Sequence, residues 1–73
     1  MNLPNVGDVH VHWGGNPWRV ERIEEGSTHE NTIIHLTCVG GFDYGRGVRL
    51  GTIAWNLREF RYDFGPAIAR EPA

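Results

Sequence analysis

A β-hairpin can be read directly from residues 7–20 of this chain, GDVHVHWGGNPWRV. Val9, Val11 and Trp13 alternate with polar residues, which is the period-two pattern of a strand with one buried face. The Gly-Gly-Asn-Pro turn that follows consists of residues that accept positive φ or fix φ near about −65°, and a second strand begins at Trp18. The hairpin predicts a small β-domain and indicates no activity.

The rest of the chain continues this pattern in short segments. We expect strands over Asp8–Trp13, Trp18–Glu24, Thr32–Val39, Val48–Ala54 and Phe60–Phe64. In the second strand Ile23 is out of phase with Val20 by one residue, so we place a β-bulge at Glu21-Arg22. The stretch Ala54–Phe60 does not alternate and predicts a single 3₁₀ turn, and from Gly65 we expect a frayed tail.

A chain of 73 residues is long enough for one domain and too short for two. We therefore expect a single domain over residues 1–73, with its core at about 7–64. Five short strands, one bulge and one 3₁₀ turn predict an all-β fold, a small five-stranded SH3-like barrel. An OB-like barrel is the alternative, although it usually needs a longer chain.

The segment His12–Val20, HWGGNPWRV, resembles the opening of a family of small bacterial and phage SH3-like domains of unknown function. Ile33-Ile34 fit the place of that family's next strand, and Val48-Arg49 is similar to its later Val-Arg step. The chain departs from the family pattern at Leu50, where a proline is usual, and in its longer loop Gly40–Gly47. The resemblance implies the SH3-like fold and suggests a phage or mobile-element origin. It implies no activity.

The single cysteine, Cys38, excludes an intrachain disulfide, which in a domain of this size favours a reducing compartment. Residues 1–6 lack the pattern of a signal peptide, and no apolar segment reaches the roughly 20 residues of a membrane helix. We therefore expect a cytoplasmic protein with no membrane association. Because Cys38 lies mid-strand among apolar residues and no nucleophile or phosphate-binding motif is present, we also predict a non-catalytic protein without a cofactor.

The charge pattern bears on the kind of partner. The formal net charge of −2 argues against affinity for nucleic acid through bulk charge. All seven basic residues are arginine, which reflects either GC-rich coding or selection for planar, forked donors. The second half holds Arg46, Arg49, Arg58 and Arg61, and the first half holds Glu21, Glu24, Glu25 and Glu30. We favour a protein partner for an accessory or adaptor module, with single-stranded nucleic acid as the alternative.

Aromatic residues near the predicted loops are the candidates for binding. Trp13 ends the first strand and is expected at the rim of the barrel. Phe42 and Tyr44 lie on a glycine-rich loop with little apolar support, and Arg46 follows two residues later as a cation beside a stacking surface. Together with Arg49 these residues form the predicted partner-binding set. The alternative is a hairpin loop without a binding role, in which Phe42 folds back onto the barrel.

The remaining aromatic residues divide between the core and a predicted edge. Trp18, Trp55 and Phe60 are expected in the core. Phe60, Tyr62 and Phe64 alternate in the last predicted strand, so an edge strand made of them would pair with a second copy. The sequence therefore also suggests a homo-oligomer, which would supplement a thin core.

The histidines allow a third kind of function. His10 and His12 are two residues apart on a strand, so their side chains share one face. With His35 or His29 as a third ligand, and Asp8 or water as a fourth, they could hold zinc. A histidine pair is also suited to sensing pH near about 6. The simpler interpretation is a polar, solvent-facing side of the strand with no ligand.

Overall fold

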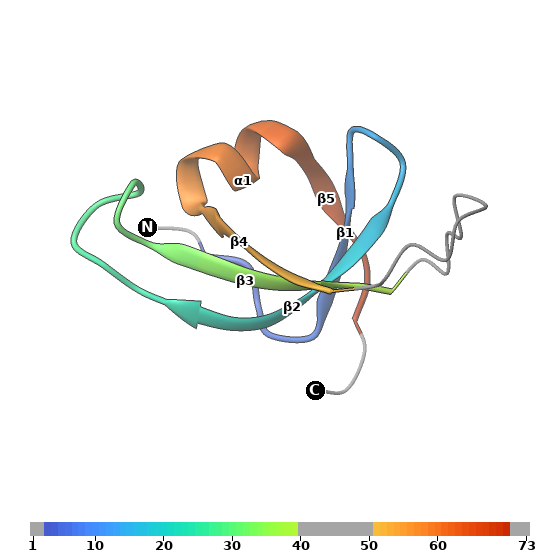
Figure 1. The fold of residues 1–73 in the computed structure, drawn as a ribbon, viewed down its shortest axis with the longest axis horizontal. Coiled ribbons are helices and arrows are strands. Elements are labelled where there is room, and N and C mark those ends of the chain that lie inside the picture. The colour runs from blue at the N-terminus through green and yellow to red at the C-terminus, as the bar shows by residue number, and fades with distance from the viewer. Residues whose placement is uncertain (1–2, 40–50, 71–73) are drawn as a thin grey trace.

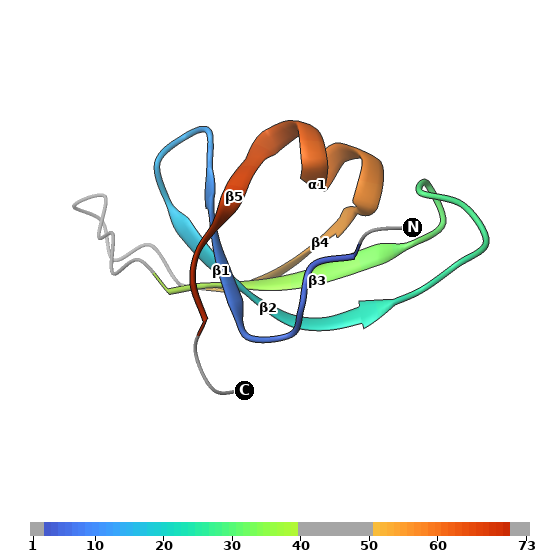
Figure 2. The same ribbon diagram turned by 180° about the vertical axis from the view of Figure 1, so that it is seen from behind.

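The computed structural model describes residues 3–39 and 51–70, which form one antiparallel sheet and a short helix. The elements are β1 (Asp8–His12), β2 (Pro17–Glu24), β3 (Ile33–Cys38), β4 (Thr52–Asn56), α1 (Leu57–Asp63) and β5 (Phe64–Arg70). The strand order is β4-β3-β2-β1-β5, and the sheet bends so that α1 lies over one face of it (Figures 1 and 2). The predicted small, five-stranded, barrel-like all-β fold is confirmed, although β4 and β5 do not pair and the sheet is not closed. Within the two described ranges, no helix has the length and apolar character needed to cross a membrane.

The predicted hairpin is present as β1 and β2. Their register places Val9 opposite Arg19 and His10 opposite Trp18. The turn between the strands is closed by the Gly15 N–H, which donates to the His12 carbonyl at 2.7 Å. Gly15 has a φ of 102°, a left-handed conformation that side-chain-bearing residues rarely adopt.

The predicted β-bulge is also present. The register of β2 against β3 shifts between Val20 and Arg22, so Glu21 is the extra residue. The shift allows Val20, which is fully buried, and Ile23, which packs against the same core, to point to the same side. A bulge of this kind bends the strand and increases its twist, which contributes to the curvature of the sheet.

The core lies between the curved sheet and α1. Its buried members are Val20, Ile34, Leu36, Leu57, Phe60 and Phe64. The Phe60 and Phe64 rings stack with centroids 4.9 Å apart. Phe60 and Cys38 are buried as predicted, whereas Trp18 and Trp55 are half-buried and pack against the core from its rim.

Residues 57–63 correct one prediction, because they form a helix instead of a 3₁₀ turn followed by a strand. The Asn56 side chain caps this helix by accepting a hydrogen bond from the Glu59 N–H at 2.8 Å. The helical geometry turns Phe60 into the core, where it meets the buried Phe64, and leaves Tyr62 exposed. The predicted self-association edge of Phe60, Tyr62 and Phe64 is therefore wrong, since two of the three side chains are buried.

The C-terminal segment corrects two further predictions. The frayed tail expected from Gly65 is instead the strand β5, which pairs with β1 and places Arg70 opposite Asp8. The Arg70 Nε–H donates to Asp8 Oδ1 at 2.9 Å, and this contact lowers the pKa of the Asp8 carboxyl. The fourth strand, Thr52–Asn56, ends two residues later than predicted, and residues 48–50 of the predicted strand lie outside the described residues.

Candidate functional site

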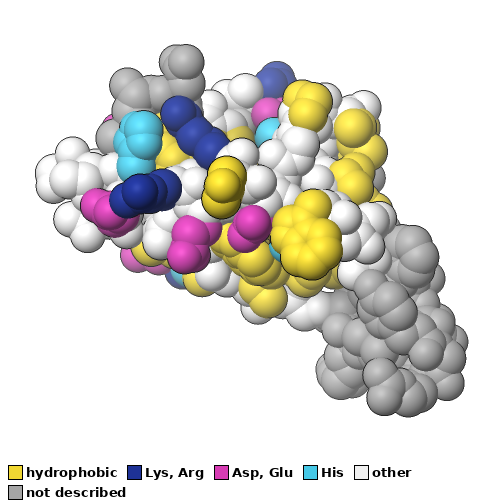
Figure 3. Space-filling view, turned by 90° about the horizontal axis from the view of Figure 1, so that it is seen from above, with side chains coloured by type: hydrophobic (Ala, Val, Ile, Leu, Met, Phe, Trp, Pro, Cys, Tyr) yellow, Lys and Arg dark blue, Asp and Glu magenta, His cyan; other side chains and the backbone are white. Residues whose placement is uncertain are grey.

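Two exposed aromatic side chains come from parts of the sequence that the fold brings together. The Trp13 N–H, just after β1, donates to the carbonyl of Asp63, the last residue of α1, at 2.9 Å. Trp13 is 78% exposed and Tyr62, the neighbour of Asp63, is 92% exposed. We call Trp13, Tyr62 and the outer side of α1 the aromatic face. Figure 3 looks onto the α1 side of the domain, where hydrophobic side chains lie among acidic and basic ones.

A cluster of rings supports Trp13 from behind. The His12 ring centroid lies 5.2 Å from that of Trp13, 5.5 Å from that of Trp55 and 5.1 Å from that of Phe64. His12 Nδ1 accepts a hydrogen bond from the Gly14 N–H at 3.0 Å, so in this arrangement the ring proton is on Nε2. The contacts tie the turn that carries Trp13 to the core.

The end of α1 is held on the same support. Trp55 Nε1–H donates to Asp63 Oδ2 at 3.0 Å, which joins β4 to the last residue of the helix. The Trp55 ring also packs edge-to-face on Phe64, with centroids 5.4 Å apart. Trp55 therefore has a partner for its polar atom as well as a packing role, whereas the exposed Trp13 indole extends beyond the core.

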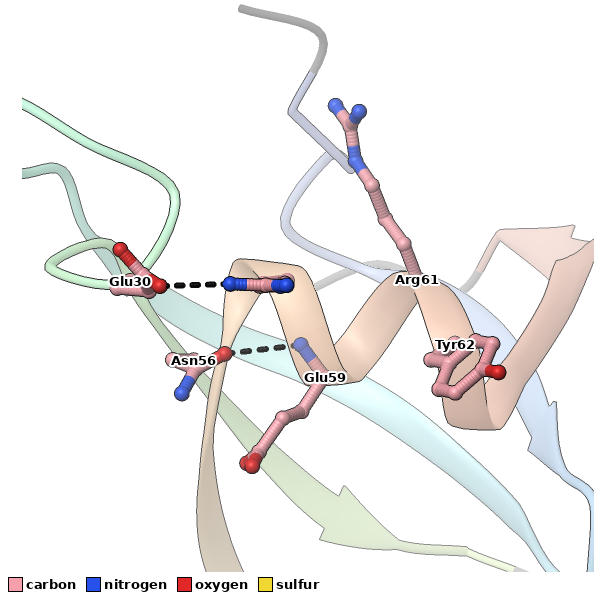
Figure 4. A pocket seen from close by; sticks show the side chains of 6 residues that line it. Glu30, Asn56, Glu59, Arg61 and Tyr62 are labelled. Carbon is pink, nitrogen blue, oxygen red and sulfur yellow. Dashed lines mark hydrogen bonds and ion pairs between the residues drawn. The ribbon is translucent and has the colours of Figure 1, made fainter.

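A pocket of about 560 Å³ lies along the outer side of α1. It is lined by Glu30, Asn56, Arg58, Glu59, Arg61 and Tyr62. The Arg58 guanidinium forms an ion pair at 2.7 Å with Glu30, which lies on the β2–β3 connection. Figure 4 shows Glu30 approaching α1 from this connection and Tyr62 at the opposite end of the helix. The pocket thus combines an aromatic ring with charges of both signs.

The structure changes the interpretation of His10 and His12. They do share one side of β1, because their rings contact Phe60 and Phe64, which stack on each other. That side faces the core and not solvent. His10 is buried, and its Nδ1 lies 2.9 Å from the Gly65 carbonyl, so Nδ1–H is the donor.

The third predicted metal ligand is engaged elsewhere. His35 on β3 is hydrogen-bonded to Glu24 on β2. This contact and the nearby charge of Arg22 lower the pKa of the Glu24 carboxyl. Across residues 3–39 and 51–70, no three His, Cys, Asp or Glu side chains are placed to hold a metal ion. His10, His12 and His35 are therefore not brought together as a metal site.

The predicted partner-binding residues divide between described and undescribed parts of the chain. Trp13 is exposed at the rim, as predicted. Phe42, Tyr44, Arg46 and Arg49 all lie outside the described residues. The predicted set therefore stays a prediction, except for the exposed position of Trp13.

Sequence reasoning missed the charged residues of the α1 side. A signal was available in Asn56-Leu57-Arg58-Glu59, because an asparagine followed three residues later by glutamate is typical of a helix start. A helix at this place would have predicted Leu57 and Phe60 on the inner side and Arg58 on the outer side. Tyr62 was noticed, but as part of a strand.

Comparisons of the chain with protein-family models, with curated proteins and with solved structures find no match. The resemblance of residues 12–20 to the SH3-like family thus stays a prediction. The fold and geometry define the class as a small, barrel-like all-β domain with an aromatic and charged surface on its α1 side.

Proposed function

We propose that this domain is a non-catalytic accessory module that binds a protein partner through the aromatic face. The supporting observation is that Trp13 and Tyr62 are both largely exposed, although they come from backbone segments joined by a hydrogen bond. A tryptophan and a tyrosine that the core does not use are the residue types that dominate binding energy at protein interfaces.

The anchoring of Trp13 favours the same function. An aromatic side chain with two χ angles loses little conformational entropy on binding, and less still where its backbone is fixed beforehand. The Trp13 backbone is fixed by Asp63, and its ring rests against His12. The face is therefore suited to a partner that buries both aromatic rings.

The charges around the face favour a protein over a nucleic acid. Arg58 is already paired with Glu30, and the chain carries a net charge of −2. A surface with charges of both signs matches the mixed rim of a protein interface better than a phosphate backbone. We also propose a cytoplasmic location, which the buried free thiol of Cys38 supports.

The experiment is an affinity capture by the immobilised domain, compared across matched variants and quantified by mass spectrometry. Trp13→Ala and Tyr62→Ala should each weaken retention of the same protein by about 30-fold or more, the effect of removing an interface hot spot of roughly 2 kcal/mol. Ile68→Ala is the control, because Ile68 is also exposed but lies on β5, outside the aromatic face.

Two results would contradict this function. One is capture that both aromatic variants leave unchanged, provided that their circular dichroism spectra match the wild type. The other is binding of single-stranded oligonucleotides that weakens steeply with salt and is lost in Trp13→Ala. That result would point to base stacking on the same residues.

A further inference from the structure

The two edges of the sheet are built differently. Among the described strands β5 pairs with β1 only, but it contains Pro66, which has no N–H, and its pairing with β1 has two register shifts. Proline and bulges are devices that prevent an edge strand from pairing with another chain. β5 is therefore a protected edge.

β4, at the other end of the sheet, has none of these features. Its sequence is Thr-Ile-Ala-Trp-Asn, without a charge or a proline, and Thr52, Ile53 and Trp55 are residue types enriched in strands. It pairs with β3 in one unbroken register, from Thr52 opposite Thr37 to Asn56 opposite Ile33. Within the part of the chain that the structure describes, β3 is its only neighbour in the sheet. A regular, uncharged edge of this kind is a template for another strand.

The hydrogen bonds at the two ends of β4 show which backbone groups face outward. The Cys38 N–H donates to the Gly51 carbonyl at 3.2 Å, and the Leu57 N–H donates to the Thr32 carbonyl at 2.7 Å. In an antiparallel pair every second residue faces the partner strand. Residues 51, 53, 55 and 57 therefore face β3, and the backbone groups of the exposed Ala54 point away from the sheet.

We propose that β4 pairs in antiparallel fashion with β4 of a second copy of this chain, about a two-fold axis at Ala54. In this register the residues of β4 lie opposite residues of similar polarity in the β4 of the second copy. Ile53 lies opposite the partner's Trp55, an apolar–aromatic pair, and Thr52 lies opposite the partner's Asn56, a polar pair. The two Ala54 residues exchange both backbone hydrogen bonds at the axis, where their small side chains leave room.

The absence of charge in β4 allows this occupant. In this register residue 54 faces its own copy, so a charged side chain there would oppose a like charge, whereas a charged residue elsewhere on β4 would oppose an uncharged residue of the second copy. β4 carries none. The side of β4 that holds the half-buried Ile53 and Trp55 continues the core side of the sheet, so pairing extends both the backbone ladder and the apolar surface.

The test is the solution mass by analytical ultracentrifugation over a concentration series. The wild type should reach twice the chain mass of 8.3 kDa. Ala54→Pro should remain at the mass of one chain, because it removes the outward N–H at the axis. It should still fold, since that N–H makes no bond to β3 and proline is tolerated on an edge strand. Ala54→Thr, which keeps the N–H, is the matched control and should still dimerise.

A cross-link tests the register. Opposed residues in a hydrogen-bonded pair have Cα atoms about 5.5 Å apart, within the range of a disulfide. Ala54→Cys should therefore form a covalent dimer on mild oxidation, whereas Thr52→Cys should not, because Thr52 faces Asn56 of the other copy. The buried Cys38 is common to both variants.

Three results would overturn the proposal: a wild type that stays at the mass of one chain at its highest soluble concentration, a folded Ala54→Pro variant that still dimerises, or equal cross-linking of the two cysteine variants. An assembly larger than two chains would also overturn the two-fold pairing. The inference is independent of the proposed function, because Trp13→Ala and Tyr62→Ala leave β4 intact and should still dimerise.

Discussion

The two sides of α1 differ in what they do for the molecule. On the inner side, Leu57 and Phe60 are buried in the core, and on the outer side Arg58 and Tyr62 face solvent. Tyr62 is only two residues from Phe60, yet it is 92% exposed. This short helix therefore separates residues required for folding from residues available for binding, so substitutions on its two sides should affect different measurements.

The largest expected effect is on the inner side. Phe60→Ala should lower the free energy of unfolding by about 3–5 kcal/mol, because it removes a buried ring and leaves a cavity beside Phe64. Urea denaturation followed by circular dichroism measures the loss. Since a small domain has little stability to lose, Phe60→Leu serves as a milder variant, with a smaller decrease. Wild-type stability in both variants would show that the ring is not part of the core.

The helix cap should give the next largest effect. Asn56→Ala removes the side chain that accepts from the Glu59 N–H and should lower the free energy of unfolding by about 1 kcal/mol. Asn56→Asp keeps an acceptor at the same place and should restore most of the stability in the same urea titration. If both variants lose the same amount, the contribution of Asn56 is not capping.

A pH titration tests whether a charged residue can also contribute to folding. We expect this of Asp8, which is charged and nevertheless buried. Its hydrogen bond with Arg70 lowers the pKa of the carboxyl in the folded state, so the unfolded state binds a proton more readily. The resulting stability is fully present above the unfolded pKa of about 3.9 and is lost as pH falls through the lower, folded pKa.

Asp8→Asn should therefore flatten the decline of stability below about pH 4, the ordinary range of an aspartate. Urea denaturation at a series of pH values measures this decline. The pKa of Glu24 is also lowered, by its contact with His35 and by Arg22, so part of the acid sensitivity should persist in Asp8→Asn and decrease further with Glu24→Gln. An unchanged acid profile in Asp8→Asn would contradict the role of the Arg70 contact.

The smallest effect on stability should come from the outer side. Tyr62→Ala should change the free energy of unfolding by no more than about 0.5 kcal/mol, as is usual for exposed positions. Arg58→Ala should cost about 0.2–1 kcal/mol, the usual contribution of an exposed ion pair. The same urea titration measures both variants. A loss at Tyr62 as large as that at Phe60 would remove the distinction between the two sides of the helix.

The N-terminal half of the fold could be predicted from the sequence because its signals are local. The turn at Gly15 and the alternation around Val9 indicate the hairpin, and the phase error between Val20 and Ile23 locates the bulge. Each of these features depends on residues close in sequence, so no knowledge of distant contacts was needed.

The C-terminal part could not be predicted in the same way. Phe60, Tyr62 and Phe64 alternate like a strand, while Leu57, Phe60 and Phe64 have the three- and four-residue spacing of a helix. Leu57, Phe60 and Phe64 are all buried, and the Asn56 side chain caps α1, so the chain follows the helical pattern as far as Asp63. The burial of His10 was equally hidden, because it depends on a carbonyl at Gly65, far along the chain.

The hydrogen bond between Trp13 and Asp63 has a consequence for synthesis of the protein. A chain leaves the ribosome from its N-terminus, so the β1–β2 hairpin emerges long before Asp63 and β5. Until then Trp13 lacks the backbone partner that positions it, and β1 has β2 beside it but lacks its second neighbour, β5. The aromatic face is therefore completed only after Asp63 has been made, so a product truncated before this residue would not present it.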